Sequence, residues 1–334
     1  MKRNMKEWFE QLKTEKTKKA MPILSFPCIQ LLDVTVRELI SDAELQAKGM
    51  AMVAQRCNSL ASVSMMDLSV EAEAFGATVH ISEDEVPAVT GQLVSSMEEA
   101  EALQVPEVGA GRTGVYLSAI EKAIGRIMDR PVFAGVIGPF SLAGRLMDMT
   151  EIMVNCYIEP DMVHMVLEKS TKFLKQYIVG FQQAGANGVV IAEPAAGLLS
   201  PELNADFSIP YVKRMIEAVS NEHFAVIYHN CGNVIPLMQD ILTLGADAYH
   251  FGNAVDLLEA AALIPEDVVF MGNIDPAGEF RNGTPDSIQA ATGALLKQLA
   301  GRQNFVISSG CDIPPLSSWD NIDAFFKKVQ EFAI

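Results

Sequence analysis

The chain has 334 residues, of which 49% are hydrophobic, and a formal net charge of −17 at neutral pH. A strongly acidic surface repels the phosphate backbones of nucleic acids, so we do not expect nucleic acid as a partner. No run of about 20 apolar residues is present, so we expect no transmembrane helix, and the odd number of cysteines, five, favours a reducing cytoplasm over a disulfide framework.

The N-terminal segment, residues 1–20, is predicted to contain a helix. Met5, Trp8, Phe9 and Leu12 recur at the i, i+3, i+4, i+7 spacing of an amphipathic helix. We expect this apolar stripe to close one end of the hydrophobic core. A helix that lies on a membrane surface is the alternative for the same pattern.

Eight short β-prone runs follow along the chain. They span residues 21–26, 61–66, 131–138, 188–193, 224–228, 248–251, 268–272 and 305–308. The runs are continuously apolar, which is typical of parallel strands buried on both faces, and helical patterns such as residues 161–184 lie between many of them. This alternation predicts one TIM-like (β/α)₈ barrel domain over residues 1–334, with an open doubly wound sheet as the alternative. Residues 78–126 are expected to form a loop-rich insertion.

Polar or glycine residues gather where these predicted strands end. In chain order they are Asp67, Gly138, Glu193, His229, Cys231, Asn253, Asn273, Asp275 and Cys311. The carboxyl ends of the strands of a parallel barrel all lie on one face, where the active sites of such barrels are built. The sequence therefore predicts an enzyme whose active site lies on that face.

A metal site is predicted among these residues. His229 and Cys231 are two positions apart, so on a strand they point the same way, and Cys311 ends the last predicted strand. Imidazole and thiolate both bind zinc well, and three protein ligands leave one tetrahedral position open, as a catalytic zinc requires. The alternative is a core histidine with packed thiols, which is what we expect of the other three cysteines.

Two longer motifs surround the candidate ligands. They read YHNCGNVIPLMQDIL, from Tyr228, and SSGCDIPPLSSWDNIDAF, from Ser308. Together they resemble the zinc motif of the methylcobalamin:coenzyme M methyltransferases of the MtaA/CmuA type, a family within the uroporphyrinogen decarboxylase superfamily. Further matching segments, in the right order along the chain, are MDLSVEAEAFGA, GPFSLAGRLMD, IAEPAAGLLSP and MGNIDP.

The resemblance implies a (β/α)₈ barrel in which His229, Cys231 and Cys311 bind zinc (Zn²⁺). It implies methylcobalamin as the methyl donor, and we expect a separate corrinoid protein to deliver it, because the chain lacks the corrinoid motif D-x-H-x-x-G. The implied methyl acceptor is a small molecule, either a thiol such as coenzyme M or tetrahydrofolate.

Five further residues are candidates for roles in the site. Glu193 is a candidate catalytic residue that holds the acceptor, takes its proton or supplies a fourth zinc ligand, and a carboxylate that only caps a loop is the alternative. Asp67 lies where decarboxylases of the superfamily keep an important aspartate, so it is a second catalytic candidate, with a structural hydrogen bond as the alternative. His250, Asn253 and Gly138 are candidates for substrate contact.

Two other functions remain open. A uroporphyrinogen decarboxylase needs clustered arginines for a substrate with many carboxylates, but residues 21–39 contain only Arg37, and that reaction has no use for cysteine ligands. A protein without catalytic activity that docks a corrinoid protein is the second alternative. Zinc content and turnover of methylcobalamin distinguish these possibilities.

Overall fold

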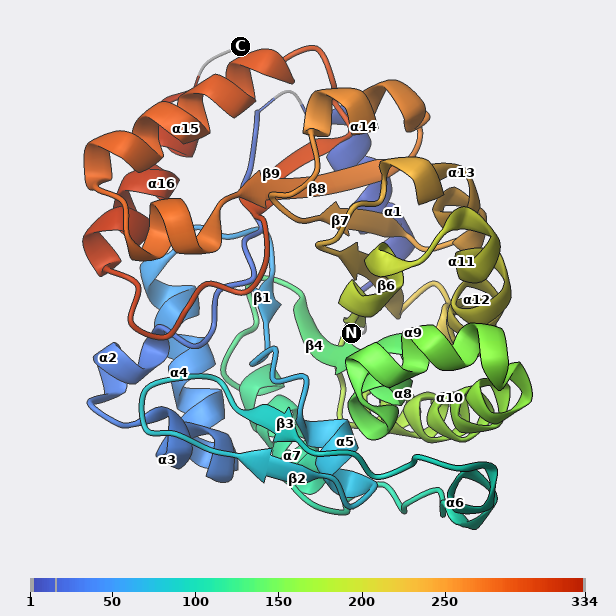
Figure 1. Ribbon diagram of the computed structural model, residues 1–334. Helices are drawn as coiled ribbons and strands as arrows, with labels where there is room; N and C mark the ends of the chain where they lie inside the picture. Colours follow the sequence, from blue (N-terminus) through green and yellow to red (C-terminus); the bar gives the residue numbers. More distant parts are fainter. Residues whose placement is uncertain (1–2, 16, 333–334) are drawn as a thin grey trace.

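The computed structural model describes residues 3–15 and 17–332, and its centre is a parallel sheet curled into a barrel (Figure 1). The order of the strands in the sheet is β1-β4-β5-β6-β7-β8-β9, and all neighbouring pairs are parallel. Their bounds are Ser62–Val63 (β1), Val132–Ile137 (β4), Gly188–Ala192 (β5), Ala225–Asn230 (β6), Ala248–Phe251 (β7), Val269–Ile274 (β8) and Phe305–Ser309 (β9). The predicted α/β barrel is confirmed, and the open doubly wound order is excluded.

The first predicted strand, residues 21–26, is wrong in its details. Ala20 makes only isolated parallel bridges, to Ser59 on one side and to Ile307 of β9 on the other. The chain there lies between the two edges of the sheet and closes the barrel without forming a regular strand. Pro22 explains the difference, because proline has no N–H group to continue a hydrogen-bonded ladder.

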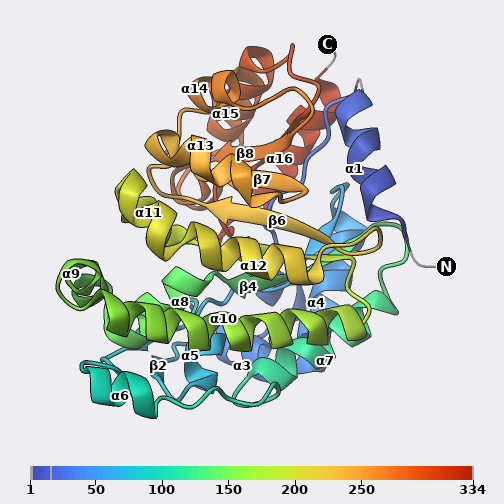
Figure 2. The ribbon, with the colours of Figure 1, turned by 90° about the vertical axis from the view of Figure 1, so that its right-hand side faces the viewer.

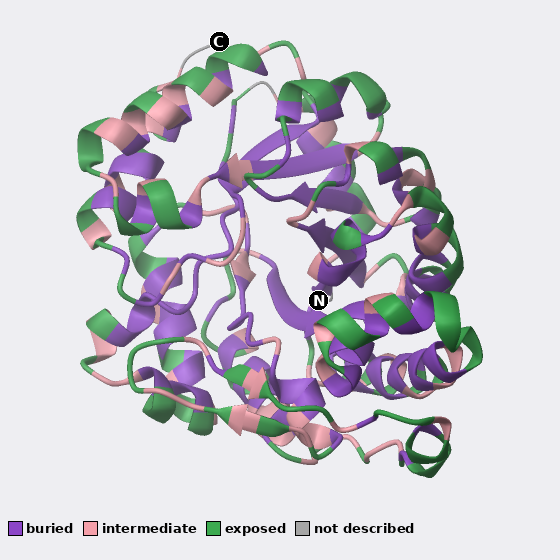
Figure 3. Cartoon of the chain, viewed as in Figure 1, coloured by how far each residue is buried: buried purple, intermediate pink, exposed green. Residues whose placement is uncertain are grey.

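The other predicted strands are found close to their expected positions. Strand β1 is shorter than predicted, whereas β6 continues past residue 228 to Asn230 and so contains His229. All residues of β4, β5, β6, β7 and β9 are buried, and Figure 3 shows these strands in the colour of buried residues. Burial on both faces accounts for the continuously apolar runs in the sequence.

Helices surround the barrel on its outside (Figures 1 and 2). The α-helices are Met5–Thr14 (α1), Cys28–Leu32 (α2), Val36–Ser41 (α3), Ala43–Arg56 (α4), Val70–Ala74 (α5), Met97–Ala102 (α6), Thr113–Ile124 (α7), Pro139–Met147 (α8), Met149–Ile158 (α9), Pro160–Gln183 (α10), Pro201–Phe207 (α11), Ile209–Val219 (α12), Met238–Ile241 (α13), Leu257–Leu263 (α14), Pro285–Gln298 (α15) and Trp319–Glu331 (α16). Short 3₁₀ segments span Pro194–Leu198 (η1), Ile235–Leu237 (η2) and Leu242–Leu244 (η3), and a π-helical turn spans Pro276–Arg281 (η4). Within the described ranges, no helix is both long enough and apolar enough to cross a membrane.

The segment 78–126, expected to be loop-rich, contains more structure than predicted. Strands Thr78–His80 (β2) and Ala88–Thr90 (β3) form a small antiparallel sheet outside the barrel. Helix α7 packs against α4 in the outer layer and completes the crossover between β1 and β4. The sequence hides α7 because glycines precede it and Gly114 interrupts its apolar pattern.

Helix α1 covers the amino-terminal end of the barrel. Its buried face consists of Met5, Phe9 and Leu12, which belong to the same hydrophobic cluster as the inward-facing residues of the strands. Figure 2 shows α1 at the end of the barrel opposite the arrowhead of β6. Asn4 caps the helix by accepting a hydrogen bond from Glu7 N–H at 3.1 Å. Residues 1, 2 and 16 of the predicted N-terminal segment lie outside the described residues.

A buried acid links the helical layer to β4. Glu71, on α5, is 2% exposed, and its Oε1 accepts a hydrogen bond from the Ile137 N–H at 3.0 Å. Its Oε2 has no partner among the described residues. Burial raises the pKa of Glu71 to about 8, because a charged carboxylate is poorly solvated there.

We expect Glu71 to make the free energy of unfolding depend on pH. Its pKa is near 4.3 in an unfolded chain and about 8 in the folded chain, so its contribution is fully present below about pH 4 and is lost as the pH rises through 8. Glu71→Gln keeps an uncharged side chain of similar shape. The stability of this variant relative to the parent should therefore rise by a few kcal/mol, roughly, between pH 5 and pH 8.

Urea denaturation at both pH values measures this difference. The exposed Glu217→Gln on α12 is the control for the loss of one negative charge and should leave the pH dependence unchanged. A Glu71→Gln variant whose stability follows the parent across this interval would contradict the assignment.

Candidate metal centre

His229, Cys231 and Cys311 come together at the carboxyl end of the barrel. One ligand atom from each side chain lies within 4.8 Å of the others, and the Cys311 Sγ is 3.6 Å from the His229 Nε2. His229 lies within β6, and Cys231 directly follows that strand. Cys311 follows β9, which is separated from β6 by β7 and β8. The barrel thus joins residues that are far apart in the sequence.

The geometry of this group fits a tetrahedral zinc ion. Zinc–sulfur and zinc–nitrogen distances of about 2.3 and 2.0 Å place ligand atoms roughly 3.5–3.8 Å apart, close to the separation of Cys311 and His229. His229 is buried, whereas both cysteines are only partly buried. Three side chains form this group within the described residues, which is the number that leaves a fourth position for an exogenous ligand.

The two thiols share their protons unequally. The hydrogen bond from Cys311 lowers the pKa of Cys231 to about 4, although burial opposes this. The same bond, together with burial, raises the pKa of Cys311. At neutral pH the pair therefore carries a thiolate at Cys231, and a thiolate is the form of cysteine that binds metal.

A chain of buried hydrogen bonds sets the orientation of the His229 ring. The Ser308 hydroxyl donates to the Met21 carbonyl at 2.8 Å, so it has only its lone pairs left for the His250 Nε2 at 2.7 Å. Burial lowers the pKa of His250 well below its usual value, so this ring is neutral and donates from Nε2. Its Nδ1 consequently accepts from the His229 Nδ1 at 2.8 Å.

Because the His229 proton is on Nδ1, its Nε2 has a free lone pair, and this lone pair is directed at the cysteines. This is the tautomer that binds a metal, and a partner on the opposite ring nitrogen is the usual way in which proteins fix it. Both ring nitrogens of His250 are engaged inside the protein. His250 is therefore buried behind His229, and its contact with substrate stays a prediction.

Glu193 lies between the strands and α8. It is fully buried, and its carboxylate accepts hydrogen bonds from the N–H groups of Phe140, at 3.0 Å, and Ser141, at 2.6 Å. Burial raises the pKa of Glu193 to about 7, although these hydrogen bonds lower it. The side chain thus caps the amino terminus of α8, and it is not among the three grouped ligands. Gly138 leaves the space for it, since a Cβ there would lie 2.3 Å from the Glu193 Oε2.

Asp67 is fixed by a network of partners. One carboxylate oxygen accepts from the Ser69 hydroxyl at 2.6 Å, and the other accepts from the Tyr116 hydroxyl at 3.0 Å and from Arg112. The Arg112 Nε also donates to Glu73 at 2.6 Å. The structure thus gives Asp67 structural hydrogen bonds. The sequence prediction missed Arg112 and Tyr116 because both lie in or beside α7, where a loop was expected.

Asn253 lies beside the segment that carries Cys311. It is exposed, and a Cβ on Gly310 would lie 2.8 Å from its Oδ1. Gly252 is equally confined, because a Cβ there would lie 2.4 Å from the Cys231 Cα. These glycines allow the loops after β7 and β9 to approach the metal-binding group closely.

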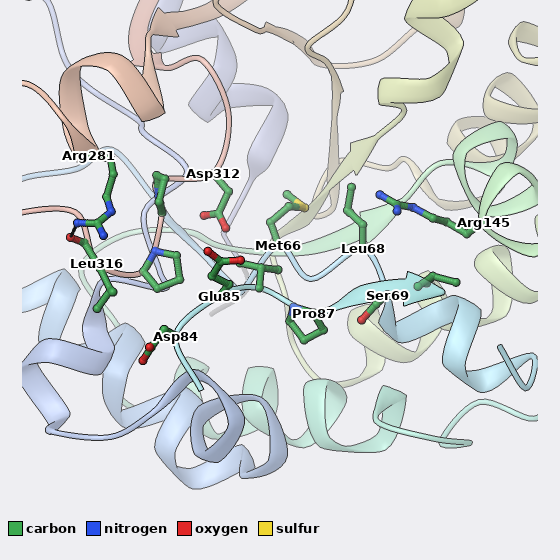
Figure 4. Close-up of a pocket in the computed structure, with 14 residues that line it drawn as sticks. Met66, Leu68, Ser69, Asp84, Glu85, Pro87, Arg145, Arg281, Asp312 and Leu316 are labelled. Carbon is green, nitrogen blue, oxygen red and sulfur yellow. Dashed lines mark hydrogen bonds between the residues drawn. The ribbon is translucent and has the colours of Figure 1, made fainter. Parts of the chain in front are cut away.

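A cavity of about 620 Å³ opens at the same end of the barrel (Figure 4). It is lined by Met66 after β1, by Asp312 directly after Cys311, and by two arginines, Arg145 of α8 and Arg281 of η4. A volume of this order holds a small organic molecule. Arg145 lies within the motif GPFSLAGRLMD, but no role for it was predicted from the sequence.

The model of the uroporphyrinogen decarboxylase (URO-D) family matches residues 17–332. The chain belongs to the uroporphyrinogen decarboxylase family. This confirms the superfamily expected from the sequence motifs.

Among the relatives of this URO-D family member, some are named as methyltransferases and others as decarboxylases. The methylcobamide:CoM methyltransferase MtbA of Methanosarcina mazei is 25% identical over 84% of each chain. The uroporphyrinogen decarboxylase of Chlorobium phaeovibrioides is 27% identical over 71% of this chain and 69% of its own. A solved structure of a methyltransferase from Methanosarcina mazei has a TM-score of 0.87 and 22% identity, with 98% of both chains covered, which shows a shared fold.

Removal of the Ser308 hydroxyl is expected to weaken the binding of added zinc at the group of His229, Cys231 and Cys311. Ser308→Ala leaves the His250 Nε2 without its acceptor and frees the His229 ring, and loss of such outer partners typically weakens metal binding roughly tenfold to a hundredfold. Competition with a chromogenic chelator measures the dissociation constant. Ser309→Ala is the matched control, because this equally buried hydroxyl accepts instead from the Ile23 N–H. Equal zinc affinity in both variants would contradict the proposed hydrogen-bond chain.

Proposed function

We propose that this chain is a zinc-dependent methyltransferase. It takes a methyl group from methylcobalamin carried by a partner corrinoid protein and transfers it to a thiol such as coenzyme M, or to tetrahydrofolate. The observation that carries this proposal is the group of His229, Cys231 and Cys311 at the mouth of the barrel. The methyltransferase name of the relative MtbA from Methanosarcina mazei supports it.

The residues of the chain would divide the chemistry as follows. His229, Cys231 and Cys311 would hold Zn²⁺, which lowers the pKa of an acceptor thiol in the fourth position and thus supplies a nucleophilic thiolate at neutral pH. His250 and Ser308 keep the ring of His229 in the required tautomer. The cavity of about 620 Å³ at the same end of the barrel, lined by Asp312 next to Cys311, would give the acceptor room.

The transfer itself balances as a displacement at carbon. The acceptor thiol would give up its proton to solvent and its sulfur would bond to the methyl carbon, while the corrinoid donor would leave with the electron pair of its bond to the methyl group. No side chain needs to form a covalent intermediate. The bulky donor reaches the acceptor from outside the carboxyl end of the barrel.

Decarboxylation of a uroporphyrinogen is less well supported. Arg37, the single arginine in the N-terminal segment considered above, is half-exposed and paired with Glu83 and with the Ile81 carbonyl at 2.6 Å. Its guanidinium is therefore already paired within the protein. A decarboxylase would also have no use for a group of one histidine and two cysteines.

The proposed function is tested by zinc content and methyl transfer in the same preparations. We expect the parent protein to bind about one zinc ion per chain, as the single tetrahedral group requires, and to demethylate methylcobalamin when coenzyme M is added. The double variant Cys231→Ser/Cys311→Ser should lose both properties. Metal analysis and the change in the absorption spectrum of the cobalamin measure the two.

Cys156→Ser is the matched control, since it makes the same thiol-to-hydroxyl change at a buried position on α9. It should keep zinc and activity. Unchanged zinc in the double variant would refute the metal site. Zinc without methyl transfer to coenzyme M, to other thiols or to tetrahydrofolate would refute the reaction, and affinity for a methylated corrinoid protein without turnover would indicate a docking protein.

A further inference from the structure

Asn230 lies between two of the three grouped residues, His229 and Cys231. It is fully buried and is the last residue of β6, whereas Cys231 lies beyond the end of the strand. In the part of the chain that the structure describes, the backbone of Cys231 makes no hydrogen bond with the backbone of another residue. The strand ladder therefore does not hold Cys231, and its position depends on what surrounds it.

The carboxamide of Asn230 makes three hydrogen bonds around this position. Its Oδ1 accepts from the Gly232 N–H at 2.8 Å, which closes a tight turn with Cys231 at its centre. Its Nδ2 donates to the Glu193 carbonyl at 2.7 Å and to the Tyr228 hydroxyl at 3.3 Å. One side chain thus connects the ends of β5 and β6 to the residue that follows Cys231.

A carboxamide suits both sides of this arrangement. The Glu193 carbonyl can only accept a hydrogen bond and the Gly232 N–H can only donate one, so the amide group fits in a single orientation. A carboxylate of the same size would place an oxygen against the Glu193 carbonyl. A hydroxyl side chain would reach the Gly232 N–H but not the carbonyl. The chemistry of the side chain at position 230 therefore matters, and not its burial alone.

Packing confines the same turn from the two neighbouring strands. A Cβ on Gly197, in η1 after β5, would lie 2.7 Å from both the Asn230 Oδ1 and the Gly232 Cα. A Cβ on Gly252, directly after β7, would lie against the Cys231 Cα. The turn is thus packed closely on both sides, while its internal hydrogen bond is made by Asn230.

We propose that Asn230 is a positioning residue that holds the Cys231 sulfur where it can bind a divalent metal ion. This inference rests on the metal site of the proposed function, but it does not depend on the reaction. Without the carboxamide, the Gly232 N–H loses its acceptor and the Glu193 carbonyl loses its donor. The turn then opens, and Cys231 no longer stays at the distance from the ion that a zinc–sulfur bond requires.

Asn230 acts on a different ligand from the hydrogen-bond chain described above. Ser308 and His250 fix the ring of His229, and they make no hydrogen bond with Asn230 among the described residues. The loss of Asn230 should therefore release a thiolate ligand, whereas the loss of Ser308 should release the histidine. The two losses are distinguished by counting the thiolates that remain bound to the metal.

Binding of zinc and of cobalt(II) to the full chain tests this role. Asn230→Ala should weaken zinc binding about tenfold to a hundredfold, as the loss of an outer partner usually does, and competition with a chromogenic chelator measures it. In the cobalt(II)-loaded protein, bound thiolates give a charge-transfer band in the near ultraviolet whose intensity follows their number. That band should weaken in Asn230→Ala and keep its intensity in Ser308→Ala.

Two further variants of asparagines separate the role of Asn230 from a general effect of a buried amide. Asn230→Ser keeps an acceptor for the Gly232 N–H, so it should recover part of the zinc affinity and part of the band. Asn304→Ala is the matched control, because this buried asparagine also donates to two carbonyls, directly before β9. It should bind both metals as the parent does. Thermal denaturation verifies that each variant is folded.

Gly197→Ala disturbs the turn without changing any of its residues. The added Cβ would press on the Asn230 Oδ1 and on Gly232, so the thiolate band should weaken as it does in Asn230→Ala. Gly301→Ala is the control, since a Cβ there would have no neighbour within 4 Å, and it should keep the full band.

Equal zinc affinity in Asn230→Ala and Asn304→Ala would overturn the role of Asn230. A weaker zinc affinity with an unchanged thiolate band would also overturn it, because the metal would then be lost for a reason other than the release of Cys231. Metal binding that depends on Asn230, in a parent that transfers no methyl group, supports the role of Asn230 and refutes only the reaction. Methyl transfer by the parent, with unaltered metal binding in Asn230→Ala, refutes only the role of Asn230.

Discussion

The hydrogen-bond chain from the Met21 carbonyl through Ser308 and His250 to His229 is the constraint on which the candidate site depends. It begins at the irregular segment that closes the barrel, where Ala20 bridges β9 and the chain before β1. Because a carbonyl can only accept, the first link dictates the direction of every later one. The segment that closes the barrel therefore also orients the His229 ring. It does so although it does not form a regular strand.

The mouth of the barrel is built from buried polar side chains that serve the scaffold. Glu193 caps α8, Asp67 holds Arg112, and Glu71 ties α5 to β4. Each carboxylate binds N–H or O–H groups that the chain would otherwise bury unpaired, at a substantial energetic cost. Acidic residues at the end of strands therefore do not by themselves mark catalysis, and partners in the structure are needed to assign them.

Features that depend on neighbouring residues in the sequence were predictable, whereas features that depend on contacts between distant residues were not. Strand positions and the convergence of His229, Cys231 and Cys311 followed from local apolar runs and from the rule that parallel strands end on one face. The proline-interrupted first strand, the helix α7 and the partners of Asp67 were not predictable, because they depend on contacts between distant segments.

Helix α1 gives the barrel only one open end. Met5, Phe9 and Leu12 fill the amino-terminal end with apolar side chains, so a molecule bound near His229 arrives and departs through the opposite rim. In the proposed reaction, the donor and the acceptor both reach the site through this open end of the barrel. The donor, a corrinoid, is much larger than the acceptor. In that reaction the acceptor would be seated before the donor covers the rim, and its methylated form would leave after the corrinoid withdraws, so that the order of binding and release would be fixed.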